Sequence, residues 1–201
     1  MQSNELLDLL KSTGAIMDGH FLLTSGRHSN IYFEKFRILE EPFALDAVCK
    51  KMAEIVAKYE VDVVLGAAIG GILLSGGLGR YLGVKHIFSE RVDGRMELRR
   101  GFEITKGQKI VIVEDIITTG GSVFELIELV EQYKAQVLHV VNLVDRTKDG
   151  IDFGVPATAL LKIPSESWEV DLCPLCDSKI NITERGRTGK KMETLWDWKY
   201  L

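Results

Sequence analysis

The chain has 201 residues, of which 46% are hydrophobic and 27% charged, and its formal net charge at pH 7 is −4. That length can bury one sizeable core, so a single domain over residues 1–201 is expected. An acidic chain has no net attraction to nucleic acid or to an anionic membrane, and no apolar stretch approaches the roughly 20 residues of a membrane span. We therefore expect neither partner. Without a basic and apolar leader, the N-terminus indicates a cytoplasmic protein.

In chain order, the hydrophobic pattern alternates between helices and strands. Apolar residues at three- and four-residue spacing predict helices over residues 3–14, 42–59, 71–82 and 122–133. Short apolar runs predict strands over residues 61–65, 84–89, 109–113, 136–143 and 158–163. This alternation predicts an α/β fold with a parallel sheet and helices on both faces. Because such folds bind ligands where strands end, the candidate binding loops are 66–71 and 114–122.

The second of these loops concentrates polar groups in nine residues. Two acids, Glu114 and Asp115, follow the apolar strand, and the remainder supplies hydroxyls and glycines, at Thr118, Thr119, Gly120, Gly121 and Ser122. A glycine-rich turn at a helix N-terminus binds phosphate through backbone N–H groups. Since carboxylates repel phosphate, we expect the two acids to bind sugar hydroxyls or Mg2+. The motif therefore predicts a sugar-phosphate site, and it lacks the lysine of a Walker loop.

This motif resembles the signature of the type I phosphoribosyltransferases: an apolar strand, two acids, two β-branched or small residues, then T-x-G-[GT]-[ST]. The resemblance implies their parallel-sheet fold with a small N-terminal hood, and Mg2+ as cofactor. It implies that Glu114 and Asp115 hold the ribose hydroxyls near a metal that arrives with the substrate, and that residues 118–122 hold the 5′-phosphate. The loop 66–71, centred on Ala68, Ile69 and Gly70, resembles the family's pyrophosphate loop.

Two further segments resemble the orotate phosphoribosyltransferases. Residues 19–33 are similar to the opening of that family, which implies that Thr24, Tyr32 and Phe33 contact the base. Val144-Asp145-Arg146 is similar to the strand end where an arginine meets the orotate carboxylate. A guanidinium suits that planar anion because it can bind both oxygens. The same resemblance also assigns Thr118 to orotate.

The implied reaction is transfer of 5-phosphoribosyl from phosphoribosyl pyrophosphate to orotate, giving orotidine 5′-phosphate and pyrophosphate in pyrimidine nucleotide biosynthesis. Two alternatives stay open: transfer to a purine or another base, and a regulatory protein that senses phosphoribosyl pyrophosphate. The expected organisation is hood elements at 1–40, an α/β core at 41–165 and a C-terminal segment at 166–201.

The sequence departs from the better-known branch of this family in its cations. That branch has lysines where Thr24 and Gly70 stand, and a lysine-rich mobile loop where residues 90–101 contain four arginines. We expect an arginine to meet the leaving pyrophosphate, Arg95 first and Arg91 second. The alternative is a solvated, charged hairpin. In the resembling enzymes this loop reaches the neighbouring subunit's site, which implies a homodimer.

Cys173 and Cys176 form a C-P-L-C segment that, with Gly186-Arg187, resembles the tail of one branch of the family. Zinc would need two further ligands, and the four histidines, at positions 20, 28, 86 and 139, lie far away in sequence. We therefore expect two thiols in a helix-capping turn, no copurified zinc, and full activity after both are replaced by serine.

Overall fold

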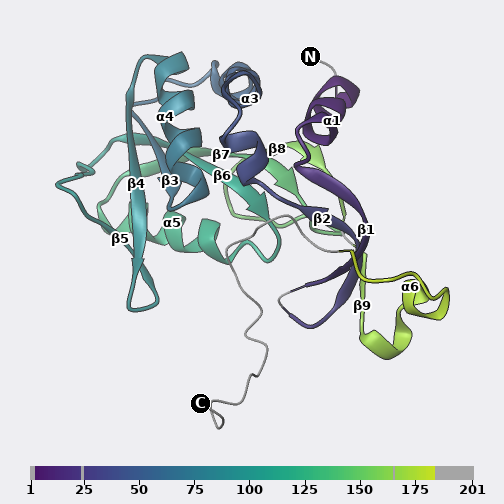
Figure 1. The fold of residues 1–201 in the computed structure, drawn as a ribbon. Helices are drawn as coiled ribbons and strands as arrows, with labels where there is room; N and C mark the ends of the chain where they lie inside the picture. The colour runs from purple at the N-terminus through teal and green to yellow at the C-terminus, as the bar shows by residue number, and fades with distance from the viewer. Residues whose placement is uncertain (1–2, 24, 165, 184–201) are drawn as a thin grey trace, which may run out of the picture. The chain divides into compact units, whose positions relative to one another are not determined.

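Figure 1 shows a computed structural model of the protein, which describes residues 3–23, 25–164 and 166–183. The chain divides into two compact units. Of the described residues, the larger unit comprises 3–16 and 35–164, and the smaller comprises 17–23, 25–34 and 166–183. The smaller unit therefore combines part of the expected N-terminal hood with part of the expected C-terminal segment. Within the described residues, no helix is both long enough and apolar enough to cross a membrane.

A six-stranded sheet forms the centre of the larger unit, in the order β5-β4-β3-β6-β7-β8. The strands are β3 (Val63–Ala67), β4 (Lys85–Val92), β5 (Arg95–Leu98), β6 (Lys109–Ile117), β7 (Gln136–Asp145) and β8 (Ala157–Lys162). Every neighbouring pair is parallel except β4 and β5, which form an antiparallel hairpin. The predicted parallel sheet is confirmed, and the charged segment 90–101 contains the end of β4, the turn and β5.

Helices cover both faces of this sheet. They are α1 (Ser3–Ser12), α2 (Phe36–Leu39), α3 (Pro42–Val56), α4 (Gly70–Leu82) and α5 (Gly121–Gln132). The helices α3 and α4 contact each other and lie on the opposite side of the sheet from α5 (Figure 1). All five residues of β3 are buried, because side chains from both of its faces lie under helices. The predicted α/β fold class is thereby confirmed.

The predicted boundaries are close to the observed ones, with one difference that affects the site. Strand β6 does not end at Val113, as predicted, but continues to Ile117. Its pairing with β7 continues to the partners Ile117 and Asp145, so the backbone of Glu114 and Asp115 belongs to the sheet. The prediction that the loop begins at Glu114 was therefore wrong. The two acids gain the rigidity of a central strand.

The smaller unit contains a three-stranded sheet in the order β1-β2-β9, with β1 (Ile16–Leu22), β2 (His28–Phe33) and β9 (Ser167–Trp168). Strand β9 pairs antiparallel with β2, and Arg27 reinforces this pairing by donating from Nε to the Ser167 hydroxyl at 3.0 Å. A 3₁₀ turn (Val170–Leu172) and the short helix α6 (Pro174–Asp177) follow. The hydrophobic pattern predicted none of these strands, because polar residues interrupt β1 and β2 and because β9 has only two residues.

Candidate active site

The candidate site lies at the point where the chain direction across the sheet reverses. Strands β3 and β6 are parallel neighbours, and Gly66, near the carboxyl end of β3, lies opposite Val113, the residue before the acid pair. From β3 the chain proceeds through α4 to β4 on one side, and from β6 it proceeds through α5 to β7 on the other. Such a reversal leaves a crevice between the two outgoing loops, which is the usual ligand site of an open α/β sheet.

The acid pair lies at the carboxyl end of β6, where both side chains are buried. Glu114 is 7% exposed and Asp115 is 4% exposed. Glu114 Oε1 accepts a hydrogen bond from the Asp115 backbone N–H at 2.9 Å, and Asp115 Oδ1 accepts one from the Ile116 N–H at 2.6 Å. Glu114 Oε2 is buried and has no hydrogen-bond partner among the described residues. A buried, unpaired carboxyl oxygen in a native fold calls for a ligand that can pair with it.

Lys35 supplies a cation that the sequence analysis missed. Its Nζ lies 2.7 Å from Asp115 Oδ2, and the Lys35 side chain is 31% exposed. The two residues are 80 positions apart, so no local pattern could have indicated the contact. The family lysines absent at Thr24 and Gly70 therefore do not leave the acid pair without a neighbouring positive charge.

The pKa of Glu114 is strongly raised. Burial is the main cause and the negative charge of Asp115 the second, and the resulting pKa of Glu114 is about 8. The ammonium group of Lys35 and the backbone hydrogen bond oppose the rise. At neutral pH the Glu114 carboxyl is therefore mostly protonated when no ligand is bound, and a ligand that donates hydrogen bonds to it would favour the ionised form.

The loop between β3 and α4 is very short and needs glycine. A Cβ atom on Gly70 would overlap the carboxylate of Asp115, and one on Gly66 would overlap the carbonyl of Gly71. The Ala68 N–H donates to the Ser89 carbonyl at 2.8 Å, and the Ala68–Ile69 peptide bond is cis. Gly70 begins α4, so the first turn of that helix lies against the acid pair. Its free backbone N–H groups therefore lie close to the same crevice.

The loop between β6 and α5 forms the second half of the site. Gly120 adopts a left-handed conformation with φ of 76°, and α5 begins at the next residue with no side-chain cap. A cavity of about 50 Å³ is lined by Glu114 and the continuous segment 116–123. That segment presents the hydroxyls of Thr118, Thr119 and Ser122 together with the N-terminus of α5. Such a polar concavity suits an anion, because the helix N-terminus carries partial positive charge.

The arginines of the charged hairpin differ in whether their side chains form ion pairs. Arg91 is tied to α5 through an ion pair with Glu125 at 2.7 Å, and Arg100 bonds Glu90 through two nitrogens, each at 2.9 Å. Within the described residues, the Arg95 side chain makes no ion pair or hydrogen bond, and it is exposed next to the turn at Asp93 and Gly94. Arg95 is therefore available to a ligand, whereas Arg91 would first have to leave Glu125.

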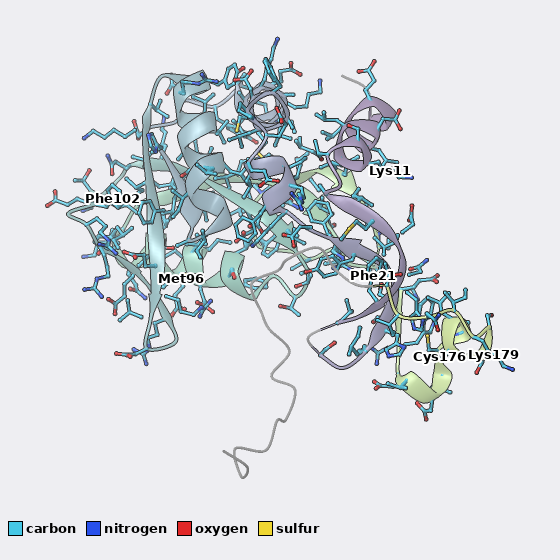
Figure 2. The ribbon with its side chains drawn as sticks, viewed as in Figure 1. Lys11, Phe21, Met96, Phe102, Cys176 and Lys179 are labelled. Carbon is cyan, nitrogen blue, oxygen red and sulfur yellow. The ribbon has the colours of Figure 1, made fainter. Side chains whose placement is uncertain are left out.

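The hairpin is nevertheless anchored to the core of the larger unit. Met96 and Phe102, labelled in Figure 2, pack against the buried cluster between the sheet and α5. The Ser89 hydroxyl donates to the Met96 sulfur at 3.4 Å, and the rings of Phe88 and Phe102 meet edge to face with centroids 5.0 Å apart. The turn between β4 and β5 is consequently the part of the hairpin that could change position with least loss of packing.

The residues assigned to the base lie in both units. Arg146 follows β7, and its backbone N–H donates to the Ile117 carbonyl at 2.9 Å, which places its backbone beside the end of β6. Tyr32 and Phe33 lie on β2 of the smaller unit, where the Tyr32 ring is 5.6 Å from that of Phe21. Thr24 lies outside the described residues. The assignment of these four residues to the base stays a prediction.

The arrangement as a whole combines an anion cradle, a buried acid pair and neighbouring cations, which suits a phosphorylated sugar. Comparisons with known proteins agree: residues 37–175 match the family model described as a phosphoribosyl transferase domain. The match covers more than half of the chain, so this protein belongs to the phosphoribosyltransferase family, as its sequence motif predicted.

The most similar relatives belong to one group of phosphoribosyltransferases. The chain is 44% identical over 184 residues to the orotate phosphoribosyltransferase of Thermotoga maritima, covering 92% of this chain and 98% of the relative. It is 45% identical over 186 residues to the orotate phosphoribosyltransferase of Chlorobium phaeobacteroides, covering 92% and 96%. Among solved structures, orotate phosphoribosyltransferase from Aeropyrum pernix superposes with a TM-score of 0.69 at 25% identity, covering 79% of this chain and 93% of that one.

Proposed function

We propose that this protein is an orotate phosphoribosyltransferase, which transfers 5-phosphoribosyl from phosphoribosyl pyrophosphate to orotate and releases pyrophosphate. One observation carries the proposal. The acid pair on β6 leads directly into a glycine and hydroxyl cradle at the start of α5, in a chain with 44% identity over nearly its full length to an enzyme of that name. The product, orotidine 5′-phosphate, belongs to pyrimidine nucleotide biosynthesis.

The cradle at residues 118–122 binds the 5′-phosphate in this proposal. Backbone N–H groups at the start of α5 and the three hydroxyls donate hydrogen bonds to its oxygens. The left-handed Gly120 sets the sharp entry to the helix, and a Cβ there would press against Ile151 and Phe153. Binding the phosphate at this fixed point aligns the sugar along the end of β6.

The acid pair binds the ribose. Its 2′ and 3′ hydroxyls donate to the carboxylates of Glu114 and Asp115, and the unpaired Glu114 Oε2 gains a donor. As the bond between C1 and pyrophosphate breaks, positive charge develops on the ring. Two preorganised carboxylates close to it stabilise that charge without reorganisation. Lys35 fixes the orientation of the Asp115 carboxylate.

The residues present also fit Mg2+, which this family resemblance implies. Carboxylate oxygens are the ligands that this hard cation prefers, and Glu114 and Asp115 provide them beside the oxygens of the substrate itself. When bound, the cation would neutralise charge on the pyrophosphate. The N-terminus of α4 and an arginine of the hairpin, Arg95 in the first place, bind the departing pyrophosphate oxygens.

Orotate binds beside the end of β7, where Arg146 pairs with its carboxylate. The nitrogen nucleophile then attacks C1 from the face opposite to the leaving pyrophosphate. Positioning of the two substrates supplies most of the rate enhancement in such a transfer, because the protein forms no covalent bond to either of them. In this proposal the enzyme is a homodimer, and each hairpin serves the site of its neighbour.

The test is an assay of the purified chain with phosphoribosyl pyrophosphate, Mg2+ and one free base at a time. We expect loss of orotate absorbance together with stoichiometric release of pyrophosphate, and no release with adenine, hypoxanthine or uracil. Turnover of another base but not of orotate would favour a different phosphoribosyltransferase. Tight binding of phosphoribosyl pyrophosphate without turnover of any base would favour a regulatory sensor.

A further inference from the structure

Four potential metal ligands converge in the smaller unit, outside the site described above. They come from β1, β2 and the segment around α6, and they are His20, His28, Cys173 and Cys176. One ligand atom from each lies within 4.8 Å of all the others. His20, His28 and Cys173 are buried, at 1%, 6% and 0% exposure. Figure 2 shows Cys176 at α6, and its side chain is half-buried.

The distances between these atoms match a tetrahedral centre in most respects. Cys173 Sγ and Cys176 Sγ lie 3.6 and 3.7 Å from His20 Nε2, and Cys176 Sγ lies 3.3 Å from His28 Nδ1. Tetrahedral zinc with its usual bond lengths places sulfur and nitrogen ligands about 3.5 Å apart. The two histidine nitrogens, at 2.7 Å, are closer than this and would have to separate slightly around an ion.

The protonation of His20 also suits a metal ligand. Its Nδ1 lies 2.6 Å from the carbonyl oxygen of Ile180, which can only accept a hydrogen bond. Nδ1 therefore carries the proton, and in the neutral ring Nε2 keeps its lone pair, which points at the two cysteines and His28. Such a hydrogen bond from the second ring nitrogen to a backbone carbonyl is the common support of a metal-bound histidine.

The backbone around the cluster is held in place. The Asp177 N–H donates to the Cys173 carbonyl at 3.2 Å, which closes the turn between the two cysteines. The His20 N–H donates to the Thr183 hydroxyl at 3.0 Å, so the segment after α6 is attached to β1. Cys173 is the N-cap of α6, yet its side chain makes no capping bond. The helix-capping role expected from the sequence is therefore not observed.

We propose that His20, His28, Cys173 and Cys176 form a structural zinc site. Two thiolates balance the charge of Zn2+, and two neutral imidazoles complete a Cys2His2 set. All four positions are filled by protein ligands, so no position remains for a substrate, which defines a structural rather than a catalytic site. The mixture of two sulfur and two nitrogen ligands favours zinc over Mg2+, which prefers oxygen. The inference is independent of the proposed transferase activity.

Zinc would also explain how so small a unit remains folded. A short three-stranded sheet and one turn of helix bury little apolar surface, and small modules commonly rely on a metal or disulfides. The premise that the histidines were too distant for zinc was wrong. The sheet pairs β1 with β2, and β2 with β9, and these pairings bring positions 20 and 28 to the cysteines.

The first experiment uses the unaltered full chain, expressed in medium containing zinc and purified without chelator. Elemental analysis should give about one zinc per chain, as expected for a closed site of this type. After removal of zinc under reducing conditions, titration with Co2+ should produce the sulfur-to-cobalt charge-transfer bands and intense visible bands of a tetrahedral dithiolate centre. These readouts do not depend on enzymatic activity.

Two matched controls test the assignment of the ligands. Cys176→Ser and His28→Ala should each lower zinc content to about one tenth or less, because loss of one ligand opens a structural site. Cys49→Ala and His86→Ala, which alter a thiol and a histidine of the larger unit, should keep full zinc content. Where a ligand variant fails to fold, the cobalt spectrum of the unaltered chain decides the question.

Three results would overturn the proposal. The first is a chain that contains no zinc and whose reduced form gives no thiolate spectrum with Co2+. The second is a disulfide between Cys173 and Cys176 in protein purified under mildly reducing conditions, which would assign this pair to redox chemistry. Equal zinc content in the ligand variants and the controls would show that the metal binds elsewhere, and this outcome too would contradict the site.

Discussion

Two buried polar clusters in the described part of the chain have opposite chemical character. The cluster at the end of β6 consists of two carboxylates and an ammonium group, and it opens onto a crevice lined by hydroxyls and helix N-termini. The cluster in the smaller unit consists of nitrogen and sulfur ligands that face one another. Oxygen ligands suit Mg2+ and exchangeable substrates, whereas a closed set of thiolates and imidazoles suits permanently bound zinc.

This contrast has a functional consequence. In the open cluster, one carboxyl oxygen of Glu114 has no hydrogen-bond partner in the described structure, so a substrate can gain binding energy by pairing with it. In the closed cluster, each ligand atom faces only the others, so nothing remains for a substrate to bind. We therefore expect changes to the first cluster to alter activity at constant metal content, and changes to the second to alter metal content and stability.

The largest effect is expected for Arg95→Ala. Removing the free guanidinium of the hairpin should lower turnover by about 10²- to 10³-fold, as for loss of one transition-state donor. The fold and the zinc content should be unchanged, because Arg95 is exposed and makes no ion pair in the described structure. Steady-state kinetics with both substrates would measure the effect. Arg100→Ala, which removes the same charge from an arginine already paired with Glu90, is the matched control.

The same variant tests the proposed homodimer. Mixing Arg95→Ala chains with Asp115→Asn chains should restore part of the activity, because one of the two sites in a mixed dimer would then combine an intact hairpin with an intact acid pair. Subunit exchange must be verified independently, for example with one chain tagged. Mixed dimers that remain inactive would indicate that each hairpin serves its own site.

A loss of similar size is expected for Asp115→Asn alone. This change removes one negative charge next to the developing positive charge on the ribose and leaves Lys35 without its partner. Turnover should fall by about 10²-fold or more, in line with loss of one preorganised electrostatic group. Asp149→Asn, at an exposed position outside the site, should have no effect. Turnover close to that of the unaltered enzyme would refute the role proposed for Asp115.

The two clusters also differ in how far the sequence could predict them. Glu114, Asp115 and the hydroxyl and glycine residues after them are contiguous, so one strand-to-helix connection brings them together whatever the rest of the chain does. The alternation of apolar segments likewise predicted the sheet and its main helices, because periodicity is a local property. The error at the end of β6 reflects pairing with β7 that continues past the last apolar run.

Contacts between distant segments had no such local signal. The pair formed by Lys35 and Asp115, and the meeting of His20 with Cys173 across 153 positions, depend on tertiary structure. Polar residues interrupt strands β1 and β2, so neither strand shows a clear alternating pattern. Pairing of these strands, not the spacing of residues along the chain, determines which side chains meet in the smaller unit.

The affinity for orotate is expected to fall moderately when the Arg146 side chain is removed. Arg146→Ala should raise the KM for orotate by about 10- to 10²-fold, the usual cost of losing hydrogen bonds to a charged group. The KM for phosphoribosyl pyrophosphate should change by less than about twofold, since that substrate lacks the carboxylate. Kinetics at varied concentrations of each substrate would separate the two constants. Equal weakening of both would argue for a structural role at the end of β7.

The smallest expected effect is the pH dependence of substrate binding that arises from the proton on Glu114. It tests whether the carboxyl of the first cluster is accessible to the substrate. With a pKa of about 8 in the free protein, this carboxyl is mostly protonated at neutral pH, and the ribose hydroxyls would bind its ionised form. Binding of phosphoribosyl pyrophosphate should then release a proton below pH 8, and affinity should rise about fivefold between pH 7 and pH 8 as the ionised fraction grows.

The sign of the effect on stability provides an independent check. An unfolded glutamate titrates near 4.5, so between that value and about 8 the folded chain holds a proton that the unfolded chain has lost. This group therefore stabilises the fold relative to its ionised form at low pH, and its contribution is lost as pH rises through that range. Calorimetry in buffers of different ionisation enthalpy would count the released protons. Glu114→Gln should abolish both the proton release and this part of the pH dependence, while titration of the substrate phosphates remains. Proton release that is the same in Glu114→Gln and in the unaltered chain would assign it to the substrate alone, and the buried carboxyl would then have no part in binding.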